Sequence, residues 1–150
     1  MRTTLLLGDF ARVAEGKLDV IGGGWTYTGP DPVTMGLGII VEVPWDQANT
    51  THELSLSLLG ADGRLVVLPG PDGGEQTIQL ATQFEVGRPA GQAAGTPIPF
   101  PLAVNVNAVP LPPGERFEWR LELNGETHED WSLRFQTRPR PPAANSPTSF

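Results

Sequence analysis

The chain of 150 residues has no cysteine, an acidic charge balance and no long apolar run. Without cysteine it can form no disulfide, no thiolate nucleophile and no zinc site held by thiolates. Lysine and arginine number 10 against 17 acids, and the net charge of −7 repels phosphate backbones. We therefore predict no nucleic-acid partner. No stretch approaches the ~20 apolar residues of a spanning helix, so we predict no membrane insertion.

The start of the chain carries only a weak resemblance to an export signal. Arg2 is followed by leucines at positions 5–7, but Asp9 ends this run. An h-region needs roughly 7–15 apolar residues, which this run does not supply. We expect a protein that is made and kept in the cytoplasm.

Glycine and proline, in contrast, are abundant. The chain contains 18 glycines and 16 prolines spread between apolar runs, a distribution that predicts many turns and an all-β fold. The clearest strand lies within residues 112–125, between the turn dipeptides at 113–114 and 124–125. Its apolar and charged residues alternate with period two, as in a half-buried antiparallel strand. The apolar positions are Phe117, Trp119, Leu121 and Leu123, and the charged ones are Glu118, Arg120 and Glu122.

Further short strands are predicted on both sides of this one. They cover residues 3–7, 18–21, 36–43, 53–59, 65–68, 76–86, 102–106 and 131–137. Residues 9–17 are mixed and could hold a short turn of helix, whereas Asp62 and Gly63 favour a hairpin turn. Eight or nine strands without a helical period predict a two-sheet antiparallel β-sandwich, immunoglobulin-like or Greek-key. A β-barrel is the alternative.

The sequence divides into a sandwich domain at residues 1–137 and a proline-rich C-terminal tail at 138–150. Prolines 139, 141 and 142 favour polyproline II in the tail. Within the domain, residues 87–101 form the longest irregular stretch and are rich in Gly, Pro and Ala. A loop of this length in a small domain is often functional or a crossover between sheets.

Four tryptophans and one tyrosine are the candidate ligand-binding residues. Trp119 and Trp131 are in phase with apolar neighbours, so we assign them to the core. Trp25, Tyr27 and Trp45 are the candidates for a small-ligand or carbohydrate site, although packing in the core or in loops is the simpler interpretation.

Metal binding and phosphate binding have weaker support. Glu126, His128, Glu129 and Asp130 crowd one connection and could hold a divalent cation, but solvated side chains are the simpler interpretation. His52 and His128, the only histidines, are expected to be structural or to face solvent. Glycines 22–24 lack the Lys and Ser/Thr spacing of a phosphate-binding loop, so a structural bulge or a close backbone approach is favoured.

Several segments resemble an uncharacterised family of short bacterial, mainly actinobacterial, proteins. These are the opening GKLDVIGGGW at 16–25 after the leucines at 5–7, VPWD at 43–46, FEVGRP at 84–89, and LPPG at 111–114 with Trp119. The resemblance covers roughly residues 1–138 and implies a compact β-sandwich. It implies no known activity and supplies no catalytic residues.

From these features we predict a non-catalytic protein-interaction or structural module without a cofactor. No serine, threonine or histidine carries an activating motif, so we predict that the protein is not an enzyme. Its partner is expected to be another protein or copies of itself, bound through loops, an edge strand or the tail. The alternatives are a small-ligand or carbohydrate-binding module and a calcium-stabilised sandwich.

Overall fold

The computed structural model describes residues 1–30 and 32–142, and these residues form strands joined by turns. The prediction of an all-β fold is confirmed. Twelve strands in this part of the chain exceed the eight or nine expected. They are β1 (Arg2–Gly8), β2 (Phe10–Ala14), β3 (Lys17–Ile21), β4 (Tyr27–Thr28), β5 (Val33–Val43), β6 (His52–Gly60), β7 (Val67–Pro69), β8 (Glu75–Thr77), β9 (Gln79–Phe84), β10 (Ile98–Val109), β11 (Arg116–Leu123) and β12 (Ser132–Thr137). A 3₁₀ turn, η1 (Trp45–Gln47), follows β5.

Strand β5 is the centre of a three-stranded antiparallel sheet with the order β1-β5-β10. Every second residue from Val33 to Val43 is apolar and buried, as its alternation predicts. Strand β10 is longer than expected because Pro99 and Pro101 do not end it. Proline is tolerated there since β10 is an edge strand, in which one side of the backbone needs no ladder bonds.

Strand β11 lies inside a five-stranded sheet with the order β4-β12-β11-β6-β9. The predicted alternation is confirmed, because its four apolar side chains at 117, 119, 121 and 123 are all buried. The indole Nε1 of Trp119 donates to the sulfur of Met35 at 3.2 Å, which joins β11 to β5. Phe84 likewise stacks on Phe100 at 4.3 Å between ring centroids. The buried faces of the two larger sheets thus share one core.

The remaining strands form two hairpins, β2–β3 and β7–β8, so the described residues make four sheets instead of two. The short turn of helix predicted for residues 9–17 is wrong. Glu15 and Gly16 both have positive φ (53° and 72°), as a tight hairpin turn requires, and they join β2 to β3. The strand predicted at 76–86 is divided into β8 and β9 around Ile78.

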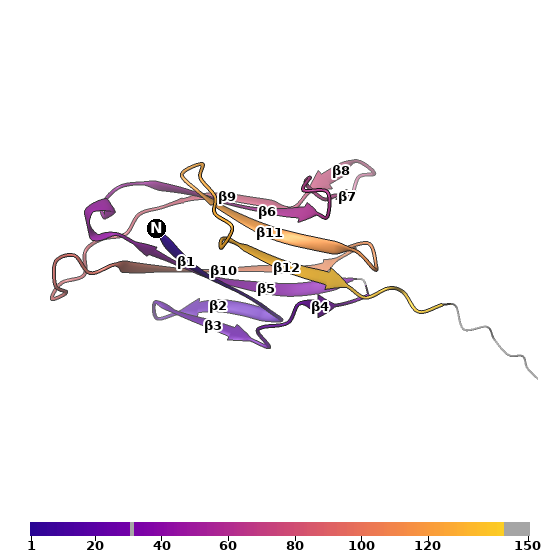
Figure 1. Cartoon of the computed structure of the whole chain (residues 1–150), viewed down its shortest axis with the longest axis horizontal. Helices are drawn as coiled ribbons and strands as arrows, with labels where there is room; N and C mark the ends of the chain where they lie inside the picture. The colour runs from indigo at the N-terminus through magenta and orange to yellow at the C-terminus, as the bar shows by residue number, and fades with distance from the viewer. Residues whose placement is uncertain (31, 143–150) are drawn as a thin grey trace, which may run out of the picture.

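The β2–β3 hairpin covers part of the outer face of the three-stranded sheet (Figure 1). Gly36 and Gly38 of β5 permit this close approach. A Cβ on Gly36 would lie 2.5 Å from the backbone N of Ala11, and one on Gly38 would lie 2.5 Å from Val20. Asn105 of β10 fixes the hairpin, because its side chain accepts from the backbone N–H of Ala11 at 2.9 Å and donates to the same residue's carbonyl at 2.8 Å.

Glycines 22–24 return the chain from the hairpin to the sheet. The backbone N–H of Gly24 donates to the carbonyl of Leu7 at 2.7 Å. A Cβ on Gly8 would lie 3.1 Å from the Cα of Gly23. These contacts confirm the predicted close backbone approach at the three glycines.

The molecule is elongated along its strands, and its two ends differ (Figure 1). One end holds η1 and the connection from β9 to β10, and the chain leaves β12 at the other. In the described part of the chain, no helix has the length and apolarity to cross a membrane.

Candidate functional site

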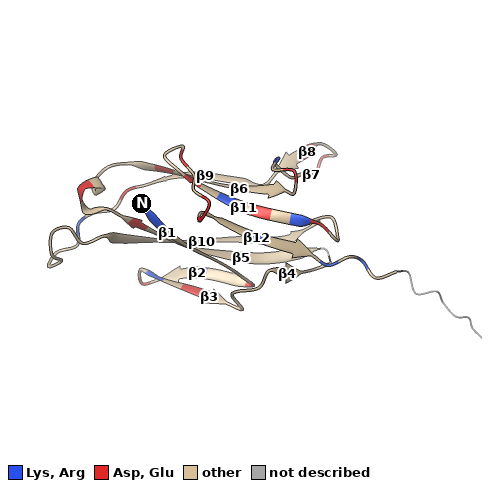
Figure 2. Ribbon diagram, viewed as in Figure 1, with Lys and Arg blue, Asp and Glu red and all other residues tan. Residues whose placement is uncertain are grey.

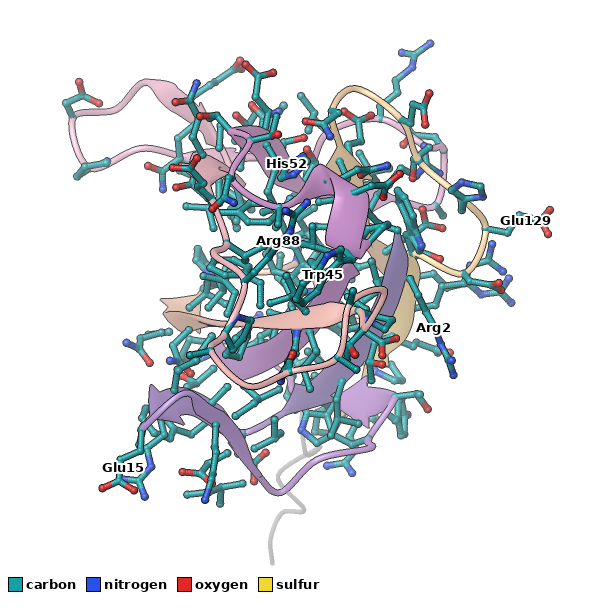
Figure 3. The ribbon with its side chains drawn as sticks, turned by 90° about the vertical axis from the view of Figure 1, so that its left-hand side faces the viewer. Arg2, Glu15, Trp45, His52, Arg88 and Glu129 are labelled. Carbon is teal, nitrogen blue, oxygen red and sulfur yellow. The ribbon has the colours of Figure 1, made fainter. Side chains whose placement is uncertain are left out.

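Trp45 marks the end of the molecule that carries the candidate site. It is the first residue of η1, it is half-buried, and Pro44 directs the chain into the turn with φ −58° and ψ 146°. Figure 3 looks onto this end and shows Arg88 beside Trp45. The guanidinium carbon of Arg88 lies 5.1 Å from the centroid of the indole ring, within the range of a cation–π contact.

The same arginine ties the following loop to η1. Its Nε and Nη2 groups both donate to the carbonyl oxygen of Trp45, at 3.1 and 2.9 Å. The backbone N–H of Asn49 donates at 2.8 Å to the carbonyl of Val86, the residue directly before the loop. The base of the loop is therefore held by three hydrogen bonds and a ring contact.

The loop itself covers residues 87–97. It is shorter than the predicted irregular stretch at 87–101, because β10 already begins at Ile98. It has no charged side chain beyond Arg88. Its own turns are closed by hydrogen bonds: the amide of Gln92 donates to the carbonyl of Pro89 at 3.4 Å, and the hydroxyl of Thr96 donates to the carbonyl of Ala93 at 2.6 Å. Residues 87–95 are exposed, so an uncharged and internally bonded loop projects from this end.

A hollow of about 490 Å³ lies between η1, the start of β1 and the end of the loop. Its walls combine an aromatic ring and two prolines with two carboxylates. The lining residues are Met1, Arg2, Glu42, Pro44, Trp45, Asp46, Gly95 and Pro97. Arg2 pairs with Glu42 at 3.4 Å on the rim, and Asp46 is exposed.

His52 is buried and bonds to the backbone of η1. Its ring is 4 % exposed, and Nε2 lies 2.9 Å from the carbonyl oxygen of Gln47. A carbonyl only accepts, so Nε2 carries the proton, and Nδ1 accepts from the side-chain amide of Asn124 at 3.1 Å. The ring also packs against Phe84 at 5.4 Å. His52 is thus a structural residue, as expected, and it joins η1 to the turn after β11.

The other two aromatic candidates lie elsewhere. The indole N–H of Trp25 donates to the carboxylate of Asp9 at 3.0 Å, and its ring meets Phe135 edge-on at 6.1 Å. Tyr27 is 47 % exposed on β4, at the end where β12 finishes, and Arg138 lies 5.0 Å from its ring centroid. The structure therefore does not bring Trp25 and Tyr27 together with Trp45.

The candidate metal ligands Glu126, His128, Glu129 and Asp130 are all exposed. The imidazole of His128 packs against the ring of Trp131 at 4.5 Å. No three His, Asp or Glu side chains in residues 1–30 and 32–142 gather closely enough to hold a metal ion.

A larger hollow of about 610 Å³ crosses the outer face of the five-stranded sheet. Three arginines, 116, 120 and 134, line it together with Glu118. The Glu118 carboxylate pairs with Arg120 at 2.7 Å and with Arg134 at 3.2 Å. The charged alternation of β11 indicated this polar face, but the pairing across to β12 depends on strand register, which the sequence does not specify.

The family match covers nearly the whole domain. The chain belongs to a family of unknown function (DUF6941). The family model matches residues 3–136. The DUF6941 match therefore covers β2 to β11 completely, and β1 and β12 except for Arg2 and Thr137. Trp45 and the loop at 87–97 fall inside the match, whereas the residues after Thr137 fall outside it. Comparison with curated proteins and with solved structures finds no match.

Proposed function

We propose that this DUF6941 chain is a non-catalytic protein-interaction or structural module. It binds through the end of the molecule that holds η1 and the loop at 87–97, which we call the Trp45 end. The observation that carries the proposal is the anchored loop at 87–97, whose base Arg88 locks onto Trp45. Loops held by a rigid scaffold are the usual carriers of binding in β folds. A loop that is already ordered loses less conformational entropy when a partner docks.

The chemistry of this end suits a protein surface. The loop offers backbone groups and small side chains, and the neighbouring hollow offers the Trp45 ring and prolines. Tryptophan in a half-buried setting is a frequent anchor of protein interfaces, because it contributes a large apolar area and an N–H donor. Among the described residues, β9 and β10 are edge strands, and their outer edges are further surfaces for a partner.

The proposal includes an immunoglobulin-like or Greek-key sandwich as the scaffold. The chain crosses between the two larger sheets from β5 to β6, from β9 to β10 and again from β10 to β11. Such crossings, together with the shared core, support this arrangement. A cytoplasmic location in a bacterium is also part of the proposal, and the lack of cysteine is compatible with it.

A small-ligand or carbohydrate-binding function ranks second. The hollow places Trp45 near the carboxylates of Glu42 and Asp46, and a ring with adjacent acceptors can hold a sugar. The guanidinium of Arg88 lies against the same ring, however, and reduces the area available for stacking. A change in tryptophan fluorescence on addition of a sugar would favour this function, provided that the W45F variant shows no such change.

Site-specific photo-cross-linking tests the proposal directly. A photoreactive phenylalanine analogue replaces Ala93 in the loop in one full-length chain and Lys17, at the start of β3, in another. Both positions are exposed, so the substitutions disturb the fold equally little. We expect a covalent protein adduct from position 93 after irradiation in cells, and none from position 17.

Mass spectrometry of the adduct identifies whether the partner is a second copy of the chain or another protein. Irradiation that yields no protein adduct from position 93 would contradict an interaction role for this end. Equal adduct formation from both positions would show that contact is random, and it would also count against the proposal.

A further inference from the structure

The hollow of about 610 Å³ on the outer face of the five-stranded sheet has an excess of positive charge, although the net charge of the chain is −7. Its charged lining residues, among those that the structure describes, are Arg116, Arg120, Arg134 and Glu118. Three positive charges therefore stand against one negative charge. Figure 2 shows blue and red alternating along β11, the strand that supplies three of the four residues. The hollow has the charge of a site for an anion.

Strand register gathers these charges on one rigid face. Alternate residues of β11 point outward because the residues between them, at 117, 119 and 121, are buried in the core. Strand β12 places Arg134 directly opposite Glu118, and β6 places Leu59 opposite the same glutamate on its other side. Leu59 is buried and forms an apolar part of the floor. Three paired strands thus fix the positions from which the arginines extend.

Glu118 engages two of the arginines and leaves the third without a counter-charge. Its Oε2 accepts from Nη2 of Arg120 at 2.7 Å, and its Oε1 accepts from Nε of Arg134 at 3.2 Å. Both carboxylate oxygens are therefore occupied. Arg116 is exposed and forms no ion pair with any described residue. The side chain of Arg134 is 82 % exposed, and a guanidinium has five N–H donors, so it keeps donors for a ligand.

The charges that border the hollow do not supply a partner for Arg116. Asp62 and Arg64 lie in the turn at one rim and carry opposite charges. Glu122 accepts from a serine hydroxyl of β6 at 3.3 Å. Glu115 is bonded through its backbone to Thr137, which is buried, so the alternation directs the Glu115 side chain to the other face.

The acidic character of the whole chain does not prevent an anion from binding here. At physiological ionic strength, charges are screened over about 8 Å. A ligand in the hollow therefore responds more strongly to the adjacent guanidinium groups than to carboxylates on distant strands and turns.

The spacing of the arginines favours an extended ligand with several carboxylates. Guanidinium groups bind carboxylates and phosphates through two parallel hydrogen bonds. Arg116 and Arg120 are four residues apart on β11, which separates their Cα atoms by roughly 13 Å. A single phosphate would require the arginines to converge on one point, whereas an extended acidic segment can meet them one after another.

We propose that this hollow binds an extended, carboxylate-rich segment of a partner protein, with carboxylates of the segment bonded to Arg116 and Arg134. Arg116 lies opposite Gln136, close to where the chain leaves β12, and thus at the other end of the molecule from η1 (Figure 1). The inference goes beyond the proposed function, because it adds a second surface that does not depend on Trp45.

Fluorescence anisotropy with a synthetic acidic peptide tests the site. The full-length chain is titrated into dye-labelled hexaglutamate, and hexaglutamine of the same length is the uncharged comparison. We expect the chain to bind hexaglutamate and not hexaglutamine. The R116E variant is expected to bind hexaglutamate at least about tenfold more weakly, because like charges then face each other. R116K keeps the charge but loses the bidentate fork, so its affinity should lie between the two.

The matched control is K17E, which makes the same charge change at the start of β3. Lys17 is exposed on the hairpin that covers the other large sheet, away from the hollow. K17E is expected to bind hexaglutamate as the native chain does. Arg116 is also exposed and unpaired in the described residues, so neither variant should disturb the fold.

Three results would overturn the inference. The first is a native chain that does not bind hexaglutamate, and the second is an equal loss of affinity in R116E and K17E. The third is displacement of the labelled peptide by inorganic phosphate as effectively, molecule for molecule, as by unlabelled hexaglutamate, which would make the hollow a phosphate site. The photo-adduct from Ala93 does not depend on any of these results, so the two proposals are tested separately.

Discussion

At the scale of single residues, the site depends on a few polar side chains that each hold two elements. Arg88 bonds the loop to η1 through two donors and one ring contact. His52 joins η1 to the turn after β11 through both ring nitrogens. Asn105 joins β10 to the β2–β3 hairpin in the same way. Arg88 and Asn105 are exposed, whereas His52 is buried against Phe84 at the edge of the core.

Replacement of Arg88 with Ala is expected to loosen the loop without unfolding the domain. The arginine is largely exposed, so the free energy of unfolding should change by less than about 1 kcal/mol. Hydrogen exchange by mass spectrometry should show faster exchange at residues 89–97. R64A, which removes an exposed arginine elsewhere, serves as the control, and unchanged exchange in R88A would contradict the anchoring role.

Replacement of Asn105 with Ala is expected to lower the free energy of unfolding by about 1–3 kcal/mol. The variant leaves the backbone N–H and carbonyl of the buried Ala11 without their partners. Urea unfolding measures the loss. N107A, two residues further along β10, is expected to cost less than about 0.5 kcal/mol. Equal stability of the two variants would contradict the bonds to Ala11.

Some of these residue roles could be predicted from the sequence and others could not. Trp119 and Trp131 were expected in the core because they are in phase with apolar neighbours, and both are buried. Trp45 was a candidate because it ends a strand. The contact of Arg88 with Trp45 joins positions 43 residues apart, and no local pattern reports such a pair.

At the scale of elements, the β2–β3 hairpin is a layer that the sequence predicted only in part: the strand at 18–21 was expected, whereas β2 was not. Its strands have five residues each, too few for a clear period of two, and Phe10 and Ile21 expose apolar side chains to solvent. The hairpin is stable because Gly36 and Gly38 let it approach the sheet. The strands β5, β6 and β11 were predictable because each buries one regular apolar face.

Replacement of Gly36 with Ala is expected to push the hairpin off the sheet. The new Cβ would lie 2.5 Å from the backbone N of Ala11 and 2.6 Å from the carbonyl carbon of Phe10, and backbone atoms cannot move aside freely. Overpacking of this kind costs about 1–3 kcal/mol of stability, measurable by urea unfolding.

The matched control for this prediction is G74A. Its Cβ would meet only the side-chain oxygen of Asp72 at 3.4 Å, in ordinary contact. The control should match the parent protein within about 0.5 kcal/mol. If G36A unfolds at the same urea concentration as G74A, the hairpin does not pack on Gly36 as described.

At the scale of the whole molecule, the two ends are chemically different. One end carries the anchored loop, Trp45 and exposed carboxylates, and the other releases a basic, proline-rich tail. The division into a domain ending at Thr137 and a tail follows from composition, since apolar alternation stops there. The direction in which residues 138–142 leave the fold depends on topology, which composition does not specify.

The central claim is that the Trp45 end is a contact surface. Self-association through this end is its most direct form, and solution mass measures it. Light scattering after size exclusion, over a concentration series, compares the full-length chain with its D46K and E129K variants. We predict that the native chain and E129K rise above the monomer mass of 16.1 kDa with concentration, and that D46K stays at that mass. A native chain that stays at the monomer mass throughout, or a D46K variant that assembles like the native chain, would contradict self-association through this end.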